Sequence, residues 1–90
     1  MDINVDELDY SKYKLPYDIS EDDFKRILKC SYEEAIQLTV DELIEVIDVL
    51  RIFIFRNKYS EDYRTKEWYA VGNMESNYRH ALAVVKGEIK

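Results

Sequence analysis

The chain has 90 residues, of which 47% are hydrophobic and 36% are charged, so it can form one globular domain and is too apolar to stay disordered. Its net charge of −6 and its pI near 4.7 argue against direct nucleic-acid binding. One cysteine excludes an internal disulfide, and neither a secretory leader nor an apolar run of the ~18 residues that span a bilayer is visible. We therefore expect a protein of the cytoplasm that does not enter a membrane.

The charge is unevenly distributed along the chain. Residues 1–48 hold 14 acidic and 5 basic side chains, whereas residues 49–90 hold 5 acidic and 8 basic ones. The favoured interpretation is that the two halves pack together and neutralise each other. The alternative is an acidic face that binds a basic partner protein.

Residues 1–18 are predicted to form an irregular arm. Pro16 interrupts any helix there, and the apolar residues follow neither the helical nor the strand period. Several of them are tyrosines, whose rings suit contact with an apolar surface. We expect an ordered arm that lies across a helical body formed by residues 20–90, with a frayed tail as the alternative.

Three helix starts follow in series, each marked by a hydroxyl residue that can cap the first turn. Ser20 precedes three acidic residues, which favour the positive end of a helix dipole. Ser31 with Glu34, and Thr39 with Glu42, have the spacing of a capping box, in which two residues satisfy each other's backbone N–H groups. The helices predicted from these starts cover residues 21–30, 32–38 and 40 to about 58.

The third predicted helix is apolar on nearly every side. Among residues 43–55 only Glu45, Asp48 and Arg51 are polar, and we expect Arg51 to pair with Asp48 one turn earlier. Because β-branched and aromatic residues are frequent over 49–55, a strand is the competing prediction there. A helix buried on all sides needs several neighbours or a second subunit, so the residues off its core face form a candidate subunit interface. They are Ile44, Val49, Ile52 and Phe55.

The last helix is predicted to open at Ser60 and to end near Gly87, because glycine favours helix C-termini. Gly72 is its weak point, costing about 1 kcal/mol against alanine, and a break is expected there if the helix fails. An apolar stripe at alternating spacings of three and four marks its core face. The stripe consists of Val71, Met74, Tyr78, Ala81 and Val85. The fold predicted for residues 1–90 is thus a single all-α domain, a small bundle of three to five helices with an extended N-terminal arm.

No catalytic constellation is visible in the sequence. Cys30 and His80 are single residues of their kind, so neither a nucleophile with its base nor a zinc site is indicated. The paired carboxylates lack a calcium-loop pattern, and the two glycines lie too far apart for a phosphate loop or a dinucleotide fingerprint. We expect a protein that is not an enzyme and that holds no metal or cofactor.

The first functional hypothesis is a small acidic protein-binding module that occupies the surface of a partner, as inhibitors, immunity proteins and antitoxins do. An acidic face would steer such a module to a basic partner protein. The predicted contact surface combines carboxylates and tyrosines of the arm and the first helix. It consists of Asp6, Glu7, Asp9, Tyr10, Tyr13, Tyr17, Glu21, Asp22 and Asp23.

Two alternatives stay open. The apolar excess of the third helix favours a structural or assembly subunit of a virion or a larger complex, with a homo-oligomer as the simplest case. A cluster of basic and aromatic side chains favours a nucleic-acid-associated protein. That cluster consists of Arg56, Lys58, Tyr59, Tyr63, Arg64 and Trp68. The acidic balance and the tyrosine content are common in small accessory proteins of phages and mobile elements, although no motif supports that likeness.

Overall fold

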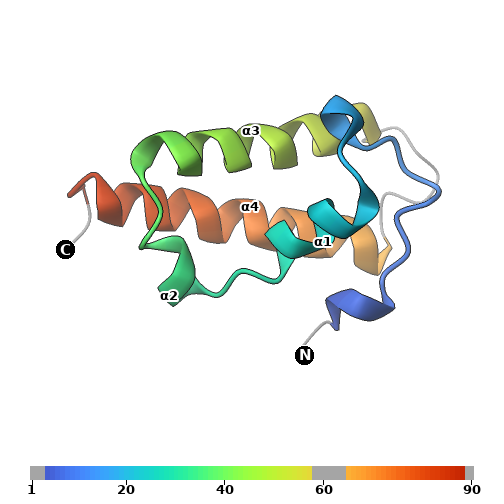
Figure 1. Cartoon of the computed structure of the whole chain (residues 1–90), viewed down its shortest axis with the longest axis horizontal. Coiled ribbons are helices and arrows are strands. Elements are labelled where there is room, and N and C mark those ends of the chain that lie inside the picture. Colours follow the sequence, from blue (N-terminus) through green and yellow to red (C-terminus); the bar gives the residue numbers. More distant parts are fainter. Residues whose placement is uncertain (1–3, 58–64, 89–90) are drawn as a thin grey trace.

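The chain folds into helices that are joined by turns (Figure 1). The computed structural model describes residues 4–57 and 65–88, and these residues contain no strand. Two short 3₁₀ helices lie in the N-terminal arm, η1 (Val5–Glu7) and η2 (Pro16–Asp18). The α-helices are α1 (Glu21–Leu28), α2 (Tyr32–Ala35), α3 (Val40–Asn57) and α4 (Lys66–Val85). The predicted all-α fold is confirmed, and the strand considered for residues 49–55 is instead the second half of α3.

The helices begin at the capping residues that the sequence indicates. Thr39 Oγ1 accepts a hydrogen bond from Glu42 N–H at 3.1 Å, and the Glu42 carboxylate accepts one from Thr39 N–H at 3.0 Å. Ser31 and Glu34 make the same reciprocal pair at the start of α2. Ser20 caps α1 with its side-chain oxygen. These bonds satisfy N–H groups that the first helical turn leaves without an intrahelical partner.

α3 and α4 form the centre of the molecule. They run antiparallel and side by side along its long axis (Figure 1), and α4 also contacts α1 and α2. Leu43, Leu50 and Phe53 of α3 and Val71 and Ala81 of α4 are fully buried in one apolar core. Burial of each large apolar side chain stabilises the fold by about 1.5–3 kcal/mol, so this pair of helices carries much of the stability.

The N-terminal arm is ordered, as predicted, and its rings enter the core. The Tyr10 ring lies 5.1 Å from that of Phe24 and 5.7 Å from that of Phe53, measured between ring centroids. Its hydroxyl donates a hydrogen bond to the Glu67 carbonyl oxygen at 3.0 Å. The Tyr13 ring is also buried. The arm therefore supplies core side chains that a chain of 90 residues needs.

The last turn of α3 holds the arm by its backbone. The side-chain amide of Asn57 donates to the Lys14 carbonyl at 3.2 Å, and its Oδ1 accepts from Lys14 N–H at 3.1 Å. The same amide donates to the Phe53 carbonyl at 2.8 Å within α3. Asn57 is buried, so these bonds satisfy polar groups that have little access to water.

α2 and α4 differ from their predicted bounds. α2 stops at Ala35, because residues 36–38 form tight turns that bring the chain round to the cap at Thr39. The predicted start at Ser60 lies outside the described residues. Within them α4 begins at Lys66, where the Thr65 side chain accepts a hydrogen bond from the first turn.

α4 passes through Gly72 without a break. The cost of one helical glycine is about 1 kcal/mol, and the buried side chains on either side of it offset that amount. The predicted stop at Gly87 is confirmed. Its φ of 81° is in the left-handed region, Gly87 N–H donates to the Val84 carbonyl at 3.0 Å, and Glu88 N–H donates to the Ala83 carbonyl at 2.8 Å. This is the Schellman arrangement that ends many helices.

Two core tyrosines make the stability of the fold sensitive to alkaline pH. Burial raises the pKa of the Tyr10 and Tyr78 hydroxyls above their ordinary value of 10.0. The folded state therefore holds these protons more tightly than the unfolded state, so the stability that they contribute is fully present below pH 10 and is lost as the pH rises above it. Each group adds a slope of up to about 1.4 kcal/mol per pH unit.

We expect urea midpoints measured above pH 10 to fall less steeply for Tyr10→Phe and Tyr78→Phe than for the parent chain. Tyr69→Phe, which removes a hydroxyl from an exposed ring, is the matched control and should keep the parental slope. Equal slopes in all four proteins would contradict the prediction.

Candidate protein-binding surface

The acidic side chains of the arm and α1 are largely paired with nearby groups. Asp6 forms an ion pair with Lys29. The Glu21 carboxylate lies 3.4 Å from Lys25 Nζ and also accepts a hydrogen bond from the backbone N–H of Tyr10 at 3.2 Å. These partners lower the net charge that the arm and α1 present to solvent.

Two further carboxylates of the same region are also engaged locally. Asp23 pairs with Arg26 at 3.3 Å. Asp9 accepts a hydrogen bond from Ser11 N–H at 2.9 Å, and hydrogen bonds from the Ser11 side chain and backbone lower the pKa of Asp9. Glu7 and Asp22 are exposed and make no ion pair within the described part of the chain. The predicted acidic surface is thus present, but most of its carboxylates serve local structure.

The three tyrosines predicted for that surface separate into two environments. Tyr10 and Tyr13 lie in the core, so their rings are not available to a partner in this conformation. They are buried because their large apolar rings attach the arm to the core, which polar side chains could not do. Tyr17 is exposed, and its φ of 55°, followed by a φ of 57° at Asp18, places two consecutive residues in the left-handed region. Non-glycine residues adopt that region at a cost of about 1–2 kcal/mol each.

The outer face of α3 carries two large apolar side chains that are exposed to solvent. Phe55 is 70% exposed and Ile44 is 46% exposed, although the other face of the same helix is fully buried. Ile52 lies partly exposed on this outer side. Val49, the fourth residue predicted for a subunit interface, packs against the core instead. Its position about 140° around the helix from Ile44 explains the difference.

The charge on α3 changes sign along the helix. Residues 40–50 carry four carboxylates and no basic side chain, whereas residues 51–57 carry two arginines and no carboxylate. Asp41, Glu45 and Asp48 are exposed and make no ion pair within the described residues. The acidic half therefore keeps more uncompensated charge than the arm does. The exposure of these three carboxylates depends on how α3 packs against the rest of the chain.

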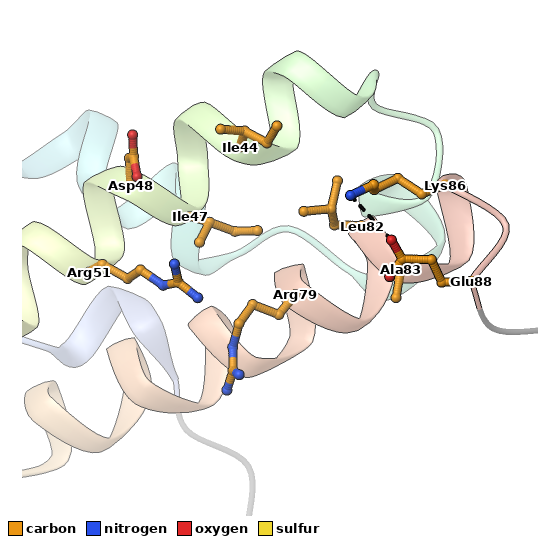
Figure 2. A pocket seen from close by; sticks show the side chains of 9 residues that line it. All are labelled: Ile44, Ile47, Asp48, Arg51, Arg79, Leu82, Ala83, Lys86 and Glu88. Carbon is orange, nitrogen blue, oxygen red and sulfur yellow. Dashed lines mark ion pairs between the residues drawn. The ribbon is translucent and has the colours of Figure 1, made fainter.

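A groove of about 280 Å³ runs between the acidic half of α3 and the end of α4 (Figure 2). Ile47 and Leu82 point toward one another at its floor, and charged side chains line its rim. At one end Arg51 reaches from α3 toward α4, where Glu75 Oε1 lies 3.1 Å from Arg51 Nε and 2.8 Å from Arg79 Nε. Glu75 is 8% exposed, so two arginines stabilise one nearly buried carboxylate.

This ion-pair cluster corrects the predicted pairing of Arg51 with Asp48. Arg51 binds Glu75 of α4, because a buried carboxylate offers a stronger partner than an exposed one that water screens. Glu75 was not among the predicted site residues. The sequence marks it only as an acidic residue beside the apolar stripe of the last helix, four positions before Arg79.

The basic-aromatic cluster can be placed only in part. Lys58, Tyr59, Tyr63 and Arg64 lie outside the described residues. Arg56 donates a hydrogen bond to the Leu15 carbonyl at 3.4 Å, and Trp68 packs against the core, with its ring 6.4 Å from that of Phe53. Both described members therefore support the fold.

Within residues 4–57 and 65–88, no three side chains of His, Cys, Asp or Glu lie close enough together to hold a metal ion. The His80 ring lies 5.6 Å from that of Tyr32 and is tilted by 43° against it, and Cys30 is a half-buried thiol. Among the described helices, none has both the length and the apolar character required to cross a bilayer.

No family model, curated protein or solved structure matches this chain. The surface must therefore be interpreted from its own geometry and charge.

Proposed function

We propose that this chain is a small acidic protein-binding module that acts by occupying a surface of another protein chain, and that the outer face of α3 is its contact surface. The observation that carries the proposal is the exposure of Phe55 and Ile44 on a helix whose opposite face is fully buried. Exposed apolar anchors that are surrounded by polar side chains are typical of protein interfaces.

The charges around these anchors indicate the kind of surface that would fit. Asp41, Glu45 and Asp48 flank Ile44, so the first half of α3 favours a surface that carries Lys or Arg. The arm and α1 are a less favoured contact, because local ion pairs already engage several of their carboxylates. Inhibitors, immunity proteins and antitoxins act by surface occupation of this kind, and the same chemistry suits an assembly subunit.

The proposal can be tested by capturing partners with and without the two anchors. The immobilised chain, the double variant Ile44→Lys/Phe55→Lys and the control Tyr17→Lys/Tyr69→Lys are incubated with lysate of the cells that produce the protein. Bound proteins are identified by mass spectrometry and their affinities are then measured with purified components. The control alters two exposed rings that belong to η2 and α4 rather than to α3.

We expect the parent and the control to capture the same proteins. The anchor variant should bind them about 30-fold more weakly, which corresponds to about 2 kcal/mol of binding free energy. Far-ultraviolet circular dichroism confirms that each variant is folded. Equal binding by all three proteins would overturn the assignment of the surface to α3.

A further inference from the structure

Four side chains form a straight stripe on the outer face of α3, and three of them, Ile44, Asp48 and Arg51, also line the groove between α3 and α4. Ile44, Asp48, Arg51 and Phe55 are separated by four, three and four positions. At 3.6 residues per turn, these spacings keep all four within an arc of about 60° and along a length of about 16 Å. The same alternation of four and three marks the seam of a coiled coil.

The order of the side chains in this stripe is self-complementary. From Ile44 to Phe55 the order is apolar, acidic, basic, apolar. In the reverse direction the order is apolar, basic, acidic, apolar, so each acidic position of one stripe meets a basic position of a reversed stripe. A second copy laid antiparallel across the stripe therefore places Ile44 beside the Phe55 of the other copy. Asp48 then faces the Arg51 of the other copy, and two-fold symmetry repeats both pairs. A parallel arrangement would instead place Asp48 against Asp48, which like-charge repulsion opposes.

The charged members of the stripe have the capacity for such contacts. Asp48 is exposed and makes no ion pair within the described residues. Arg51 reaches Glu75 through Nε alone, its side chain is 58% exposed, and its two terminal nitrogens donate to no group in the described part of the chain. An arginine can bind two carboxylates at once through these separate donors. The pairing with Asp48 that is absent within one chain is thus available between two.

We propose that the chain forms a two-fold symmetric homodimer in which this stripe of α3 packs antiparallel against the same stripe of a second copy. The inference rests on the proposed function, because it uses the same face of α3 and names the occupant. The basic surface that the acidic half of α3 favours is then the second half of α3 itself, which carries Arg51 and Arg56. α3 has 18 residues, a length of about 27 Å, so the interface is small and we expect a dissociation constant on the order of 100 µM.

The decisive experiment exchanges the charges in separate chains. Asp48→Lys gives a stripe with two cations, and Arg51→Glu gives one with two anions. In either variant alone the dimer would oppose like charges twice, whereas a mixture of the two restores both opposite-charge pairs. We expect sedimentation equilibrium to show that each variant dimerises at least about tenfold more weakly than the parent, and that an equimolar mixture regains the parental affinity as a heterodimer.

Matched charge changes elsewhere control for net charge. Glu7→Lys and Arg26→Glu alter exposed residues of the arm and α1, and their mixture should show the parental dimerisation of each component. Glu75 keeps Arg79 as a partner in Arg51→Glu, and thermal unfolding checks that this variant is folded.

Engineered disulfides test the orientation and do not depend on the charge variants. In a Cys30→Ala background, Ile44→Cys mixed with Phe55→Cys should yield mainly the mixed disulfide, whereas each variant alone should stay largely unlinked. Preferential self-linkage of either variant would overturn the antiparallel arrangement.

A parent chain that stays monomeric at about 1 mM would overturn the inference as a whole. If the Ile44→Lys/Phe55→Lys variant had nevertheless lost a captured partner, the proposed function would stand with a different occupant.

Discussion

Phe53→Ala is expected to lower the free energy of unfolding by about 3–5 kcal/mol, a large part of the total for a domain of this size. Phe53 is fully buried, and its ring lies 5.0 Å from that of Phe24 and 5.3 Å from that of Tyr13. Removal of the ring leaves a cavity where the arm, α1 and α3 meet. Neighbouring aromatic rings are too rigid to collapse into that space, so the full cavity term is expected.

The measurement is urea unfolding followed by circular dichroism, with Phe55→Ala as the matched control. The two residues lie two positions apart on α3, so helix propensity changes equally, but Phe55 is 70% exposed. We expect Phe55→Ala to cost less than about 1 kcal/mol. Phe53→Leu provides a milder change if the alanine variant does not fold at all. Equal losses for the two alanine variants would contradict the assignment of Phe53 to the core.

Asn57→Ala is expected to detach the N-terminal arm and to destabilise the fold by about 2–3 kcal/mol. The substitution removes both hydrogen bonds that the Asn57 side chain makes to the Lys14 backbone, at 3.1 and 3.2 Å. It also leaves the Lys14 N–H and carbonyl without their protein partners in a partly buried place, which adds a desolvation penalty to the lost bonds. Because the arm carries Tyr10 and Tyr13 into the core, its loosening also weakens their packing.

Hydrogen exchange followed by NMR distinguishes this effect from a uniform loss of stability. Amides of the arm should lose protection in Asn57→Ala by more than amides near Leu50 in α3 do. Asn77→Ala is the control, because Asn77 is exposed and, among the described residues, its side-chain amide reaches only the Met74 sulfur, at 3.8 Å. A parallel loss of protection throughout the chain would show that Asn57 stabilises α3 rather than the attachment of the arm.

Apolar residues lie on both the buried and the exposed face of α3. One face of the helix closes a thin core with α4 and the arm, and the other presents Ile44 and Phe55 to solvent. In a small domain such exposure lowers solubility without adding stability, which is why we assign it to contact with another chain. The adjoining groove ends at the cluster of Arg51, Glu75 and Arg79, whose ion pairs join α3 to α4. A partner that binds the outer face of α3 near Arg51 would therefore affect both central helices.

Local signals in the sequence specify where the first three α-helices start and how the last one stops. Ser20, Ser31 and Thr39 cap within three residues of their own positions, and the positive φ of Gly87 accompanies hydrogen bonds that span five positions at most. Such signals are local, so the chain carries them wherever it packs. The all-α class and the ordered arm follow from the same local pattern together with the distribution of apolar residues.

Tertiary structure alone decided which side chains are available at the surface. Tyr10 is buried because its ring packs against Phe24 and Phe53, and its hydroxyl donates to the carbonyl of Glu67, 57 positions further along the chain. Arg51 pairs with Glu75, 24 positions away. Val49 and Ile44 have the same apolar character in the sequence, yet one packs against the core and the other is exposed. These outcomes depend on the packing of distant segments, which residue types and local spacing do not specify.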